Sequence, residues 1–590
     1  MGQTIQTDVL IVGGGGGGFR AAIEASQNGA RTLLTSKGPL ARCGATPMAG
    51  ADFTLDGKSL KNLGFPGADN DTRQKFFSDI VHQGFFLNNQ RLLEQYVNSA
   101  PARLKELLAW GLKVTRSEER AIYTSGLWIM DVLLRRANAV GVDFLEDVMV
   151  LDIVRNGQQI MGAVGLDVKT GEFIRISAKA IIIATGGWHK AFWPTTGMRD
   201  LSGEGIVMAH RAGAEIGNME FVTFCCPVLL SPPHCQGSIA TYIMILRAGG
   251  HLRNTLGEEF LNKYDPFTVH KGTIMEWNKL FLSLTTAFEV RAGLGSPNGG
   301  VYYDRGGMSW NEYEEKVTSS LTGWKYKAID LSDIAARLRE GDSIEVGAVA
   351  EYFDGGIIVD ENFQTRVPGL YAAGECSLGP FGANRVCSAI TEMLVHGADA
   401  GKNAAIYSTE TDTPFHEKDA FEDVEQKASM PIKRRKGIEP GPLRRQVQQM
   451  AHQHLGPVRT ESELKQFIGF LHKVKKEKLP YMAAENSSAV YNKAWMDALE
   501  LSEMVHLLEC ATKSALLRTE SRGVHYREDY PQTDNDNWLV ETISVLRDNE
   551  LQIDTRPITA TLLSPHRGVT PYFDMLKAMM EAHSEVGGHH

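Results

Sequence analysis

Two adjacent cysteines, Cys225 and Cys226, stand in the apolar stretch FVTFCCPVLL, and His234 and Cys235 follow shortly after it. Thiols and imidazoles bind metals, but the two-residue gap of common zinc sites is missing, so we expect no metal site here. Seven cysteines, an odd number, in a chain without a recognisable signal peptide are typical of a reducing cytoplasm, where disulfides are rare. Two interpretations stay open: buried core residues, or thiols in an active site. Because neighbouring strand residues point to opposite sides, one thiol can face a pocket and the other the core.

The composition limits the class of protein that surrounds these cysteines. The chain has 590 residues, of which 43% are hydrophobic and 22% charged, which is typical of a globular protein of several domains. The net charge of −10 argues against nucleic-acid binding, which favours a basic excess. No apolar run reaches the roughly 18 residues that span a membrane.

The first forty residues predict a nucleotide-binding unit. Residues 8–12 (DVLIV) form a predicted strand, and Gly13, Gly15 and Gly18 follow with the spacing G-x-G-x-x-G. The first glycine allows a tight turn, the second lets a pyrophosphate approach the backbone, and the third lets the next helix pack on the strand. A second strand is predicted at residues 31–35. The acidic residue that usually follows it is replaced by Ser36-Lys37, which weakens the case for NAD.

Two later strands predict a longer cofactor. AKAIIIATGG (178–187) and RVPGLYAAGE (366–375) each read as a buried strand that ends in small residues, and the second is followed by an acidic residue. Parallel strands from distant parts of a chain present their carboxyl ends at one edge of a sheet, where nucleotides bind. Contacts along this whole edge suit FAD better than NAD.

Four further segments carry a family resemblance: residues 202–222 (SGEGIVMAHRAGAEIGNMEFV), 253–266 (RNTLGEEFLNKYDP), 369–385 (GLYAAGECSLGPFGANR) and 518–531 (RTESRGVHYREDYP). Together they resemble the succinate dehydrogenase and fumarate reductase flavoprotein subunits, a family that also includes L-aspartate oxidase and the adenylylsulfate reductase α subunit. The resemblance covers nearly the whole chain.

The resemblance implies an α/β fold in which a Rossmann-like FAD-binding domain is interrupted by an α+β capping domain and followed by a helical domain. We expect the FAD-binding domain at 1–224 and 347–416, the capping domain at 225–346, the helical domain at 417–545 and a C-terminal tail at 546–590. The run KAWMDALELSEMVHLLECATKSALL in the third region has the apolar spacing of a helix.

The resemblance also implies an activity and partners. Hydride passes between the flavin N5 and a substrate carbon, and electrons are exchanged with an iron–sulfur partner subunit. This chain has no Cys-x-x-Cys pattern of its own, so a cluster belongs on another chain. The implied location is the cytoplasm, or the cytoplasmic face of a membrane through partner subunits.

The implied cofactor residues occupy the motifs above. Gly13, Gly15 and Gly18 hold the pyrophosphate, while Glu204 and Glu375 meet the hydroxyls of the FAD ribose or ribityl chain. A helix that starts at Ser388, Ala389 and Ile390 points its N-terminus at the flavin C2 carbonyl, where its dipole stabilises an anionic reduced flavin. The remaining expected FAD contacts are Ser36, Lys37, Gly44, Gly50, Thr185 and Gly186. Gly44 stands where some members attach FAD to a histidine, so we predict non-covalent FAD.

The expected substrate site departs from the family pattern. Cys225 and Cys226 replace the Phe-His-Pro-Thr histidine, and Glu351 replaces a second substrate histidine. Arg247 in LRAGGHL is one position away from the family's proton-donating arginine, and a guanidinium is a poor acid, so His251 is the alternative donor. Arg385 in GANR is retained and can bind one anionic group.

These changes remove two donors to a dicarboxylate and add an acceptor. We therefore predict a FAD-dependent oxidoreductase that acts on an activated C–C bond in a small molecule other than succinate or fumarate. Two alternatives stay open: an adenylylsulfate reductase-like enzyme with a sulfur substrate, and an electron-transfer subunit without a small substrate of its own.

Overall fold

A computed structural model describes residues 3–50, 52–118, 120–157, 159–264, 275–321, 329–385, 389–412, 418–548 and 550–582. Within them, no helix is both long and apolar enough to cross a membrane.

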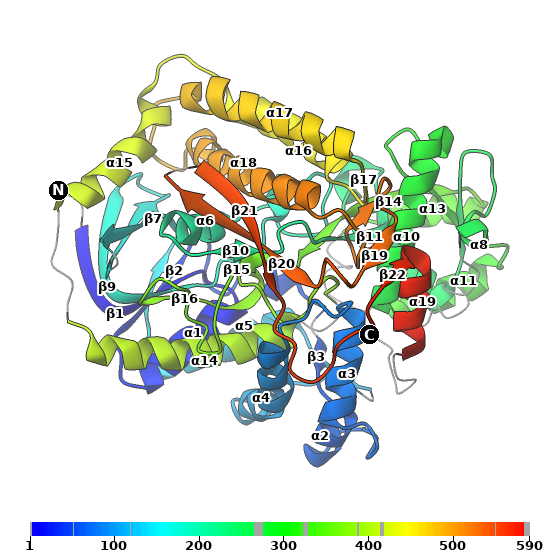
Figure 1. The fold of residues 1–590 in the computed structure, drawn as a ribbon, viewed down its shortest axis with the longest axis horizontal. Coiled ribbons are helices and arrows are strands. Elements are labelled where there is room, and N and C mark those ends of the chain that lie inside the picture. The colour runs from blue at the N-terminus through cyan, green and yellow to red at the C-terminus, as the bar shows by residue number, and fades with distance from the viewer. Residues whose placement is uncertain are drawn as a thin grey trace.

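A seven-stranded sheet forms the centre of the larger part of the molecule (Figure 1). Five of its strands are parallel, and two run antiparallel at one side. The parallel strands are β1 (Gln3–Val12), β2 (Thr32–Ser36), β6 (Asp143–Glu146), β9 (Phe173–Ile183) and β16 (Leu370–Ala372), and the antiparallel ones are β7 (Val148–Asn156) and β8 (Gln159–Asp167). The three strands predicted from sequence, β1, β9 and β16, lie side by side, so their carboxyl ends share one edge.

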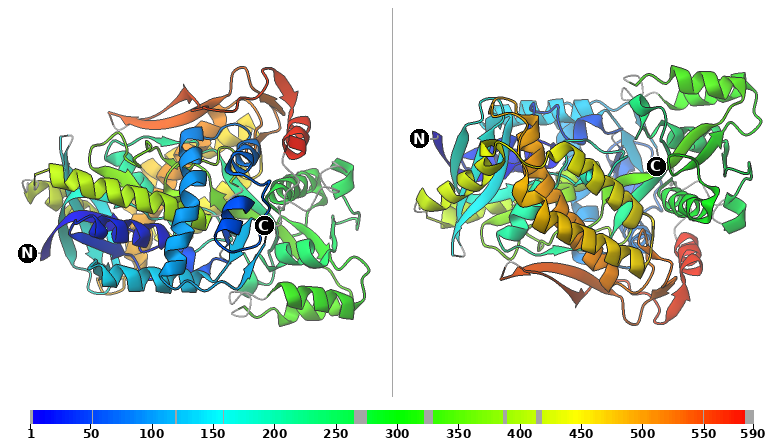
Figure 2. Two further views of the ribbon diagram at one scale, coloured as in Figure 1. Left: turned by 90° about the horizontal axis from the view of Figure 1, so that it is seen from below. Right: turned by 90° about the horizontal axis from the view of Figure 1, so that it is seen from above.

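Helices α1 (Gly16–Gln27) and α14 (Ala389–Glu410) pack closely against each other beneath this sheet (Figures 1 and 2). A Cβ atom on Gly401 of α14 would lie 2.2 Å from the backbone oxygen of Ala21 of α1, so this close contact requires glycine. Helices α4 (Gln90–Ala109) and α5 (Gly126–Ala139) complete this layer.

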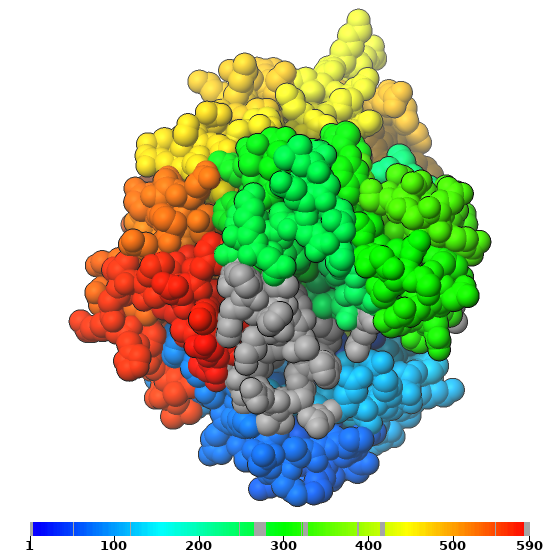
Figure 3. All heavy atoms as spheres, turned by 90° about the vertical axis from the view of Figure 1, so that its right-hand side faces the viewer, coloured from blue at the N-terminus to red at the C-terminus, as the bar shows by residue number. Residues whose placement is uncertain are grey.

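A second, antiparallel sheet carries the capping segment, which extends to the right in Figure 1 and forms the green face in Figure 3. Its strands are β11 (Val222–Leu229), β14 (Ile344–Phe353), β13 (Val301–Asp304) and β12 (His251–Arg253). Its helices are α7 (Ala240–Ala248), α8 (Leu261–Tyr264), α10 (Met275–Glu289), α11 (Trp310–Ser320) and α13 (Ser332–Glu340). Strands β11 and β14 pair with each other and run through the boundaries expected near residues 224 and 347. The division into domains stays a prediction.

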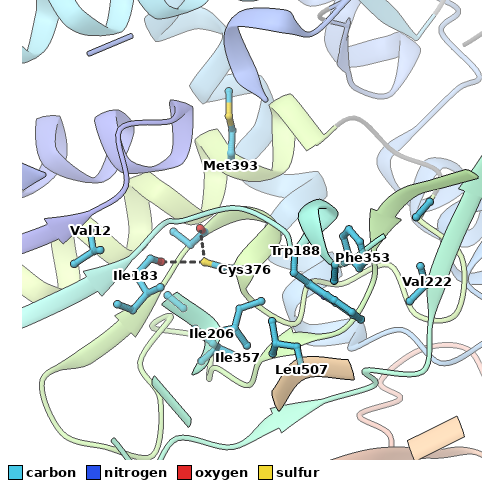
Figure 4. Packing of buried hydrophobic residues seen from close by; sticks show 14 of the residues in the cluster. Val12, Ile183, Trp188, Ile206, Val222, Phe353, Ile357, Cys376, Met393 and Leu507 are labelled. Carbon is cyan, nitrogen blue, oxygen red and sulfur yellow. Dashed lines mark hydrogen bonds between the residues drawn. The ribbon is translucent and has the colours of Figure 1, made fainter. Parts of the chain in front are cut away.

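Four helices follow, α15 (Lys418–Lys433), α16 (Pro440–His454), α17 (Glu461–Glu477) and α18 (Lys493–Leu517), which lie across the top in Figure 1. Beneath α18 lies α6 (Glu204–Arg211). Figure 4 shows Ile206 of α6 and Leu507 of α18 in one apolar cluster with Ile183 of β9 and Trp188.

Smaller sheets and helices complete the chain. One sheet has the order β15-β10-β20-β21 and consists of β10 (Ile216–Gly217), β15 (Gly356–Ile357), β20 (Val540–Arg547) and β21 (Glu550–Pro557). A second has the order β3-β5-β4 and consists of β3 (Asp52–Thr54), β4 (Arg116–Ser117) and β5 (Ala121–Tyr123). Two further strand pairs are β17 (Val458–Arg459) with β18 (Tyr526–Arg527), and β19 (Gln532–Asp534) with β22 (Val569–Pro571). The helices are α2 (Gly57–Asn62), α3 (Arg73–Gln83) and α19 (Tyr572–Ala582).

Candidate active site

A cavity of about 1400 Å³ lies between the central sheet and the capping segment. One part of its wall comes from the glycine turn after β1 and the carboxyl ends of β2, β9 and β16. The other part comes from α7, α10, α11 and β14 of the capping segment. The fold therefore joins the expected cofactor residues and capping residues in one continuous space.

The glycine turn is built for close approach of a phosphate. Gly13 has φ +123°, and a Cβ there would lie 2.3 Å from the backbone oxygen of Ala184. A Cβ on Gly18 would lie 1.9 Å from the oxygen of Gly13, so only glycine lets α1 pack on β1. Gly15 instead faces open space, with Thr46 Oγ1 as the nearest atom at 3.8 Å from a Cβ. The Gly16 N–H donates to Thr46 Oγ1 at 3.2 Å, and the N-terminus of α1 can meet a pyrophosphate beside it.

Lys37 takes the place of the usual acidic residue and binds two carboxylates of the protein. Its Nζ donates to Glu204 Oε1 at 2.7 Å, to Ser202 Oγ at 3.0 Å and to Glu500 Oε1 of α18 at 3.1 Å. These carboxylates outweigh the effect of burial and raise the pKa of Lys37 above its usual range, so it stays charged. Glu204 is thereby fixed at the cavity wall, where it can accept hydrogen bonds from a ribose.

The edge of β9 and β16 offers further polar groups to a cofactor. Thr185 Oγ1 lines the cavity and is buried without a hydrogen-bond partner among the described residues. Glu375 also lines the cavity and accepts a hydrogen bond from the Gly187 backbone N–H at 3.1 Å. An orphaned hydroxyl beside a phosphate-binding turn fits a bound dinucleotide, since buried polar groups are normally paired.

The remaining expected FAD residues lie on the same wall. Gly44, Gly50, Ser36, Gly186, Ala389 and Ile390 all line the cavity. Helix α14 begins at Ala389, so its N-terminus meets the cavity as expected, whereas Ser388 lies outside the described residues. The residues present therefore fit FAD.

Glu351 faces a cation that the sequence analysis did not find. Its Oε2 lies 2.9 Å from Nζ of Lys279 on α10, and the two side chains are only 7% and 5% exposed. The ammonium also lies over the rings of Tyr242 and Tyr352, at 5.2 and 5.3 Å from their centroids. All four residues line the cavity, so its capping side carries a buried ion pair framed by two tyrosines.

Arg385 lines the cavity as predicted, but it too has acidic neighbours. Its guanidinium donates to Glu392 of α14 and lies 3.9 Å from Asp354. Burial raises the pKa of Asp354 to about 7, although Arg385 and a hydrogen bond from Thr223 oppose this shift. The charge of Arg385 is thus already balanced within the protein.

Comparisons with known proteins agree with this geometry. Residues 8–390 match the model of the FAD binding domain, and residues 444–570 match the fumarate reductase flavoprotein C-terminal model. The chain belongs to the fumarate reductase and succinate dehydrogenase flavoprotein family. It is a FAD-dependent oxidoreductase. The predicted family, fold class and cofactor are therefore confirmed.

Relatives of this flavoprotein match along almost its whole length. One subunit of the fumarate reductase (CoM/CoB) of Methanothermobacter marburgensis is 29% identical over 90% of this chain and 96% of that protein. An uncharacterized FAD-dependent oxidoreductase of Methanocaldococcus jannaschii is 30% identical over 90% of this chain and 94% of its own length. Among solved structures, Mycobacterium smegmatis Sdh1 in complex with UQ1 matches with a TM-score of 0.84 at 28% identity, covering 95% of this chain and 96% of that one.

Several expected catalytic residues of this flavoprotein lie away from the cavity wall. Cys225 and Cys226 are fully buried on β11 and do not line the cavity, and Cys226 Sγ lies 3.3 Å from Thr286 Oγ1. Burial raises the pKa of the Cys226 thiol to about 12, so it is not a reactive thiolate. Both side chains belong to the buried core, and Cys226 contacts α10, which favours the interpretation as buried core residues.

Of the two expected proton donors, only His251 has a described side chain, and it does not join the site. His251 on β12 pairs with Glu259 at 2.6 Å and is absent from the cavity wall. Arg247 falls in α7, but its side chain lies outside the described part of the structure. The structure therefore does not support His251 as a donor.

Sequence reasoning missed several cavity residues besides the tyrosines, among them Lys279, His189 and Cys43. Lys279 lies in no sequence motif, because α10 is brought next to Glu351 only when the chain folds. His189 follows the ATGG motif closely in sequence, and its Nε2 lies 2.7 Å from the backbone oxygen of Glu351. Cys43 precedes Gly44 in ARCGATPMAG, and its Sγ lies 3.2 Å from Ser36 Oγ. Proximity to recognised cofactor motifs was the available signal for the last two.

Proposed function

We propose that this flavoprotein is the catalytic subunit of an oxidoreductase that acts on an activated C–C bond of a substrate other than fumarate or succinate. It exchanges electrons with a separate iron–sulfur partner, which accords with the absence of Cys-x-x-Cys from the chain. The resemblance also suggests a site of action in the cytoplasm, or at the cytoplasmic face of a membrane through partner subunits.

The charge arrangement of the cavity carries this proposal. The two buried cations on its substrate side, Lys279 and Arg385, already face the carboxylates of Glu351 and Glu392. A dicarboxylate that bound both cations would have to displace internal partners, leaving two buried carboxylates unpaired. A substrate with one anionic group and one cationic or hydrogen-bond-donating group matches the pair, because its donor can meet Glu351 while its anion meets a cation.

The described side chains suggest a division of roles. Bound FAD supplies hydride transfer at its N5 atom. Lys279 and Arg385 orient the anionic part of the substrate, and Tyr242 and Tyr352 pack against its body. His189 is a candidate for proton transfer: since Nε2 faces a carbonyl oxygen, it carries the proton in the neutral ring, and Nδ1 is a free acceptor. That Nδ1 atom is buried with no partner among the described residues.

Reoxidation of the reduced flavin tests the substrate class. The purified protein is photoreduced without oxygen and mixed with fumarate, with monocarboxylate enoates that carry an amino or amide donor, or with adenylylsulfate. We expect an enoate with a donor to change the flavin spectrum at least about tenfold faster than fumarate, which corresponds to about 1.4 kcal/mol of transition-state discrimination. Rapid reoxidation by fumarate would contradict the proposal.

Two controls separate the alternative functions. A strong artificial electron acceptor must reoxidise the flavin in every preparation, which shows that it is functional. If only an iron–sulfur protein reoxidises the flavin and no small molecule does, the chain is an electron-transfer subunit. Reoxidation by adenylylsulfate alone would favour the adenylylsulfate reductase-like alternative.

The attachment of FAD has its own test. Gly44 cannot form a covalent bond to the flavin, so acid precipitation is expected to leave the yellow colour in the supernatant. Flavin that stays with the precipitate would contradict non-covalent binding.

A further inference from the structure

A cluster of two histidines and one cysteine lies between α6 and α18, outside the cavity wall. One ligand atom each of His210, His506 and Cys510 lies within 4.8 Å of the others, and within the described ranges no other group of three such residues meets this condition. Nδ1 of His210 and Nε2 of His506 are 2.9 Å apart. Imidazole nitrogen and thiolate sulfur are the common ligands of Zn²⁺ in proteins.

The two helices present these side chains in a suitable arrangement. His506 and Cys510 are four residues apart on α18, so they share one face of that helix. His210 stands in the last turn of α6, which packs beneath α18 (Figure 1). Neither helix alone supplies three ligands, and the set exists only where the helices meet.

The protonation states suit metal binding. Burial lowers the pKa of His210 to about 4 and that of His506 to about 3, so both rings are neutral and can coordinate an ion. Burial raises the pKa of the Cys510 thiol to about 12 in the metal-free protein. A bound divalent cation reverses this effect, because it favours the thiolate directly.

The nearby positive charges are already balanced. Arg211 pairs with Asp152 at 3.0 Å and with Glu503 at 2.6 Å. Lys475 and Lys513 share Glu509, at 2.9 and 2.8 Å, and Arg366 pairs with Glu215 at 2.7 Å. The cluster therefore does not carry a net cationic environment that would repel a metal ion.

A fourth polar group lies next to the cluster. The Ser544 hydroxyl of β20 interacts with the Cys510 thiol, is almost fully buried, and has no well-aligned hydrogen-bond partner among the described residues. His506 is only partly buried, which gives water and ions a route to the cluster. A water molecule or the serine hydroxyl can complete a four-ligand shell.

We propose that His210, His506 and Cys510 bind a divalent cation of the zinc class, which joins α6 to α18. Helix α6 begins at Glu204 of the cavity wall, and α18 carries Glu500, which contacts Lys37. The ion therefore joins the last turn of α6 to the middle of α18, and so helps to fix the two helices whose carboxylates frame the expected ribose site. This role is structural and does not depend on the substrate proposed above.

Cobalt substitution of the FAD-loaded protein tests the site directly. The protein is treated with a chelator, and Co²⁺ is then added. We expect about one Co²⁺ per chain in a tetrahedral environment, with a near-ultraviolet charge-transfer band from the thiolate, and competition by Zn²⁺. The thiolate band separates this site from histidines at the surface. Absence of the band from the wild-type protein would overturn the proposal.

Matched variants assign the ligands. Cys510→Ser is expected to abolish the charge-transfer band, and His506→Gln to weaken Co²⁺ binding at least about tenfold. Cys235→Ser, at another buried cysteine on a different element, leaves the band unchanged. FAD content monitors folding of each variant. If one fails to fold, the wild-type protein still decides: Zn²⁺ is expected to raise its melting temperature after chelation, and no rise together with no band would reject the site.

Discussion

At the scale of single residues, the Lys279–Glu351 pair changes how the substrate site is understood. From the sequence alone, Glu351 is a negative charge that is expected to repel a dicarboxylate. In the folded protein Lys279 lies 2.9 Å away and balances this charge. Selectivity therefore depends on a buried pair, in which the Glu351 carboxylate and the Lys279 ammonium face each other.

The variant Glu351→Gln exposes this dependence. It replaces the buried carboxylate that faces the Lys279 ammonium by a neutral amide, so we expect the free energy of unfolding to fall by about 3 kcal/mol. Fumarate or succinate is then expected to restore part of the loss, because an anion can take the place of the lost carboxylate.

Urea denaturation of the FAD-loaded protein, with and without the anion, measures both effects. The control Asp423→Asn breaks an exposed pair with Lys427 and is expected to change stability by less than about 1 kcal/mol. Equal losses in the two variants would show that the buried pair has no special role.

The carboxyl group of Asp354, again a single residue, makes the stability of the folded protein depend on pH. Its pKa is raised from 3.8 to about 7, so the folded protein keeps a proton that the unfolded chain loses first. The contribution of Asp354 to the free energy of unfolding is therefore greatest below about pH 4. It falls as the pH rises towards 7, by up to about 4 kcal/mol. The variant Asp354→Asn removes the titrating carboxyl group and with it this contribution.

Denaturation curves at several pH values between 4.5 and 7.5 test the assignment. The stability of Asp354→Asn relative to the wild type is expected to increase with pH, and Thr223 can still donate to the amide oxygen. Parallel pH profiles of the two proteins would mean that Asp354 does not titrate in this range.

At the scale of elements, the contact of α1 with β1 decides whether the cofactor turn forms. Gly18 lies where a side chain would overlap the oxygen of Gly13. The same helix meets α14 at Ala21, whose backbone oxygen would lie 2.2 Å from a Cβ on Gly401. Two close backbone contacts thus fix the position of α1, whose N-terminus lies at the cavity.

A single methyl group is expected to disturb this arrangement. Gly18→Ala should lower the free energy of unfolding by about 3 kcal/mol and reduce FAD content, because α1 must move away from β1. Gly469→Ala on the exposed side of α17 meets no atom within 4 Å and should instead stabilise the protein by about 0.5–1 kcal/mol. Absorbance of bound flavin and denaturation curves measure the two outcomes, and an unchanged FAD content in Gly18→Ala would be inconsistent with this account.

At the scale of the whole molecule, a buried charge cluster connects segments that are distant in sequence. Glu520 accepts hydrogen bonds from Arg518 at 2.9 Å and from Arg522 at 2.8 Å. Arg518 also donates to Glu220, just before β11, and Arg522 donates to the backbone oxygen of Phe85. The motif RTESR thereby links the segment after α18 to both the capping sheet and the N-terminal region.

The variant Glu520→Gln tests this link. It leaves two buried guanidinium groups facing an amide, so we expect a loss of about 3–5 kcal/mol in the free energy of unfolding. Glu528→Gln breaks a half-exposed pair with Arg291 and should cost less than about 1 kcal/mol. Thermal unfolding followed by flavin fluorescence compares them, and similar melting temperatures would argue against a connecting role for Glu520.

Local sequence patterns determined the cofactor half of this protein. The glycine spacing around Gly13, the apolar strands and the small residues at their ends specify a turn and a sheet edge through contacts between near neighbours in sequence. Positive φ and close backbone approach admit only glycine there, so the motif carries the geometry with it.

Only the tertiary structure decided the properties of the capping side of the cavity and of the histidine–cysteine cluster. Cys225 and Cys226 are buried in the core, where Cys226 contacts Thr286 of α10, and Glu351 gains Lys279 from that same helix. His210 meets His506 across 296 positions of the chain. Burial and long-range pairing set the charge and reactivity of these groups, and both arise only when distant segments pack together.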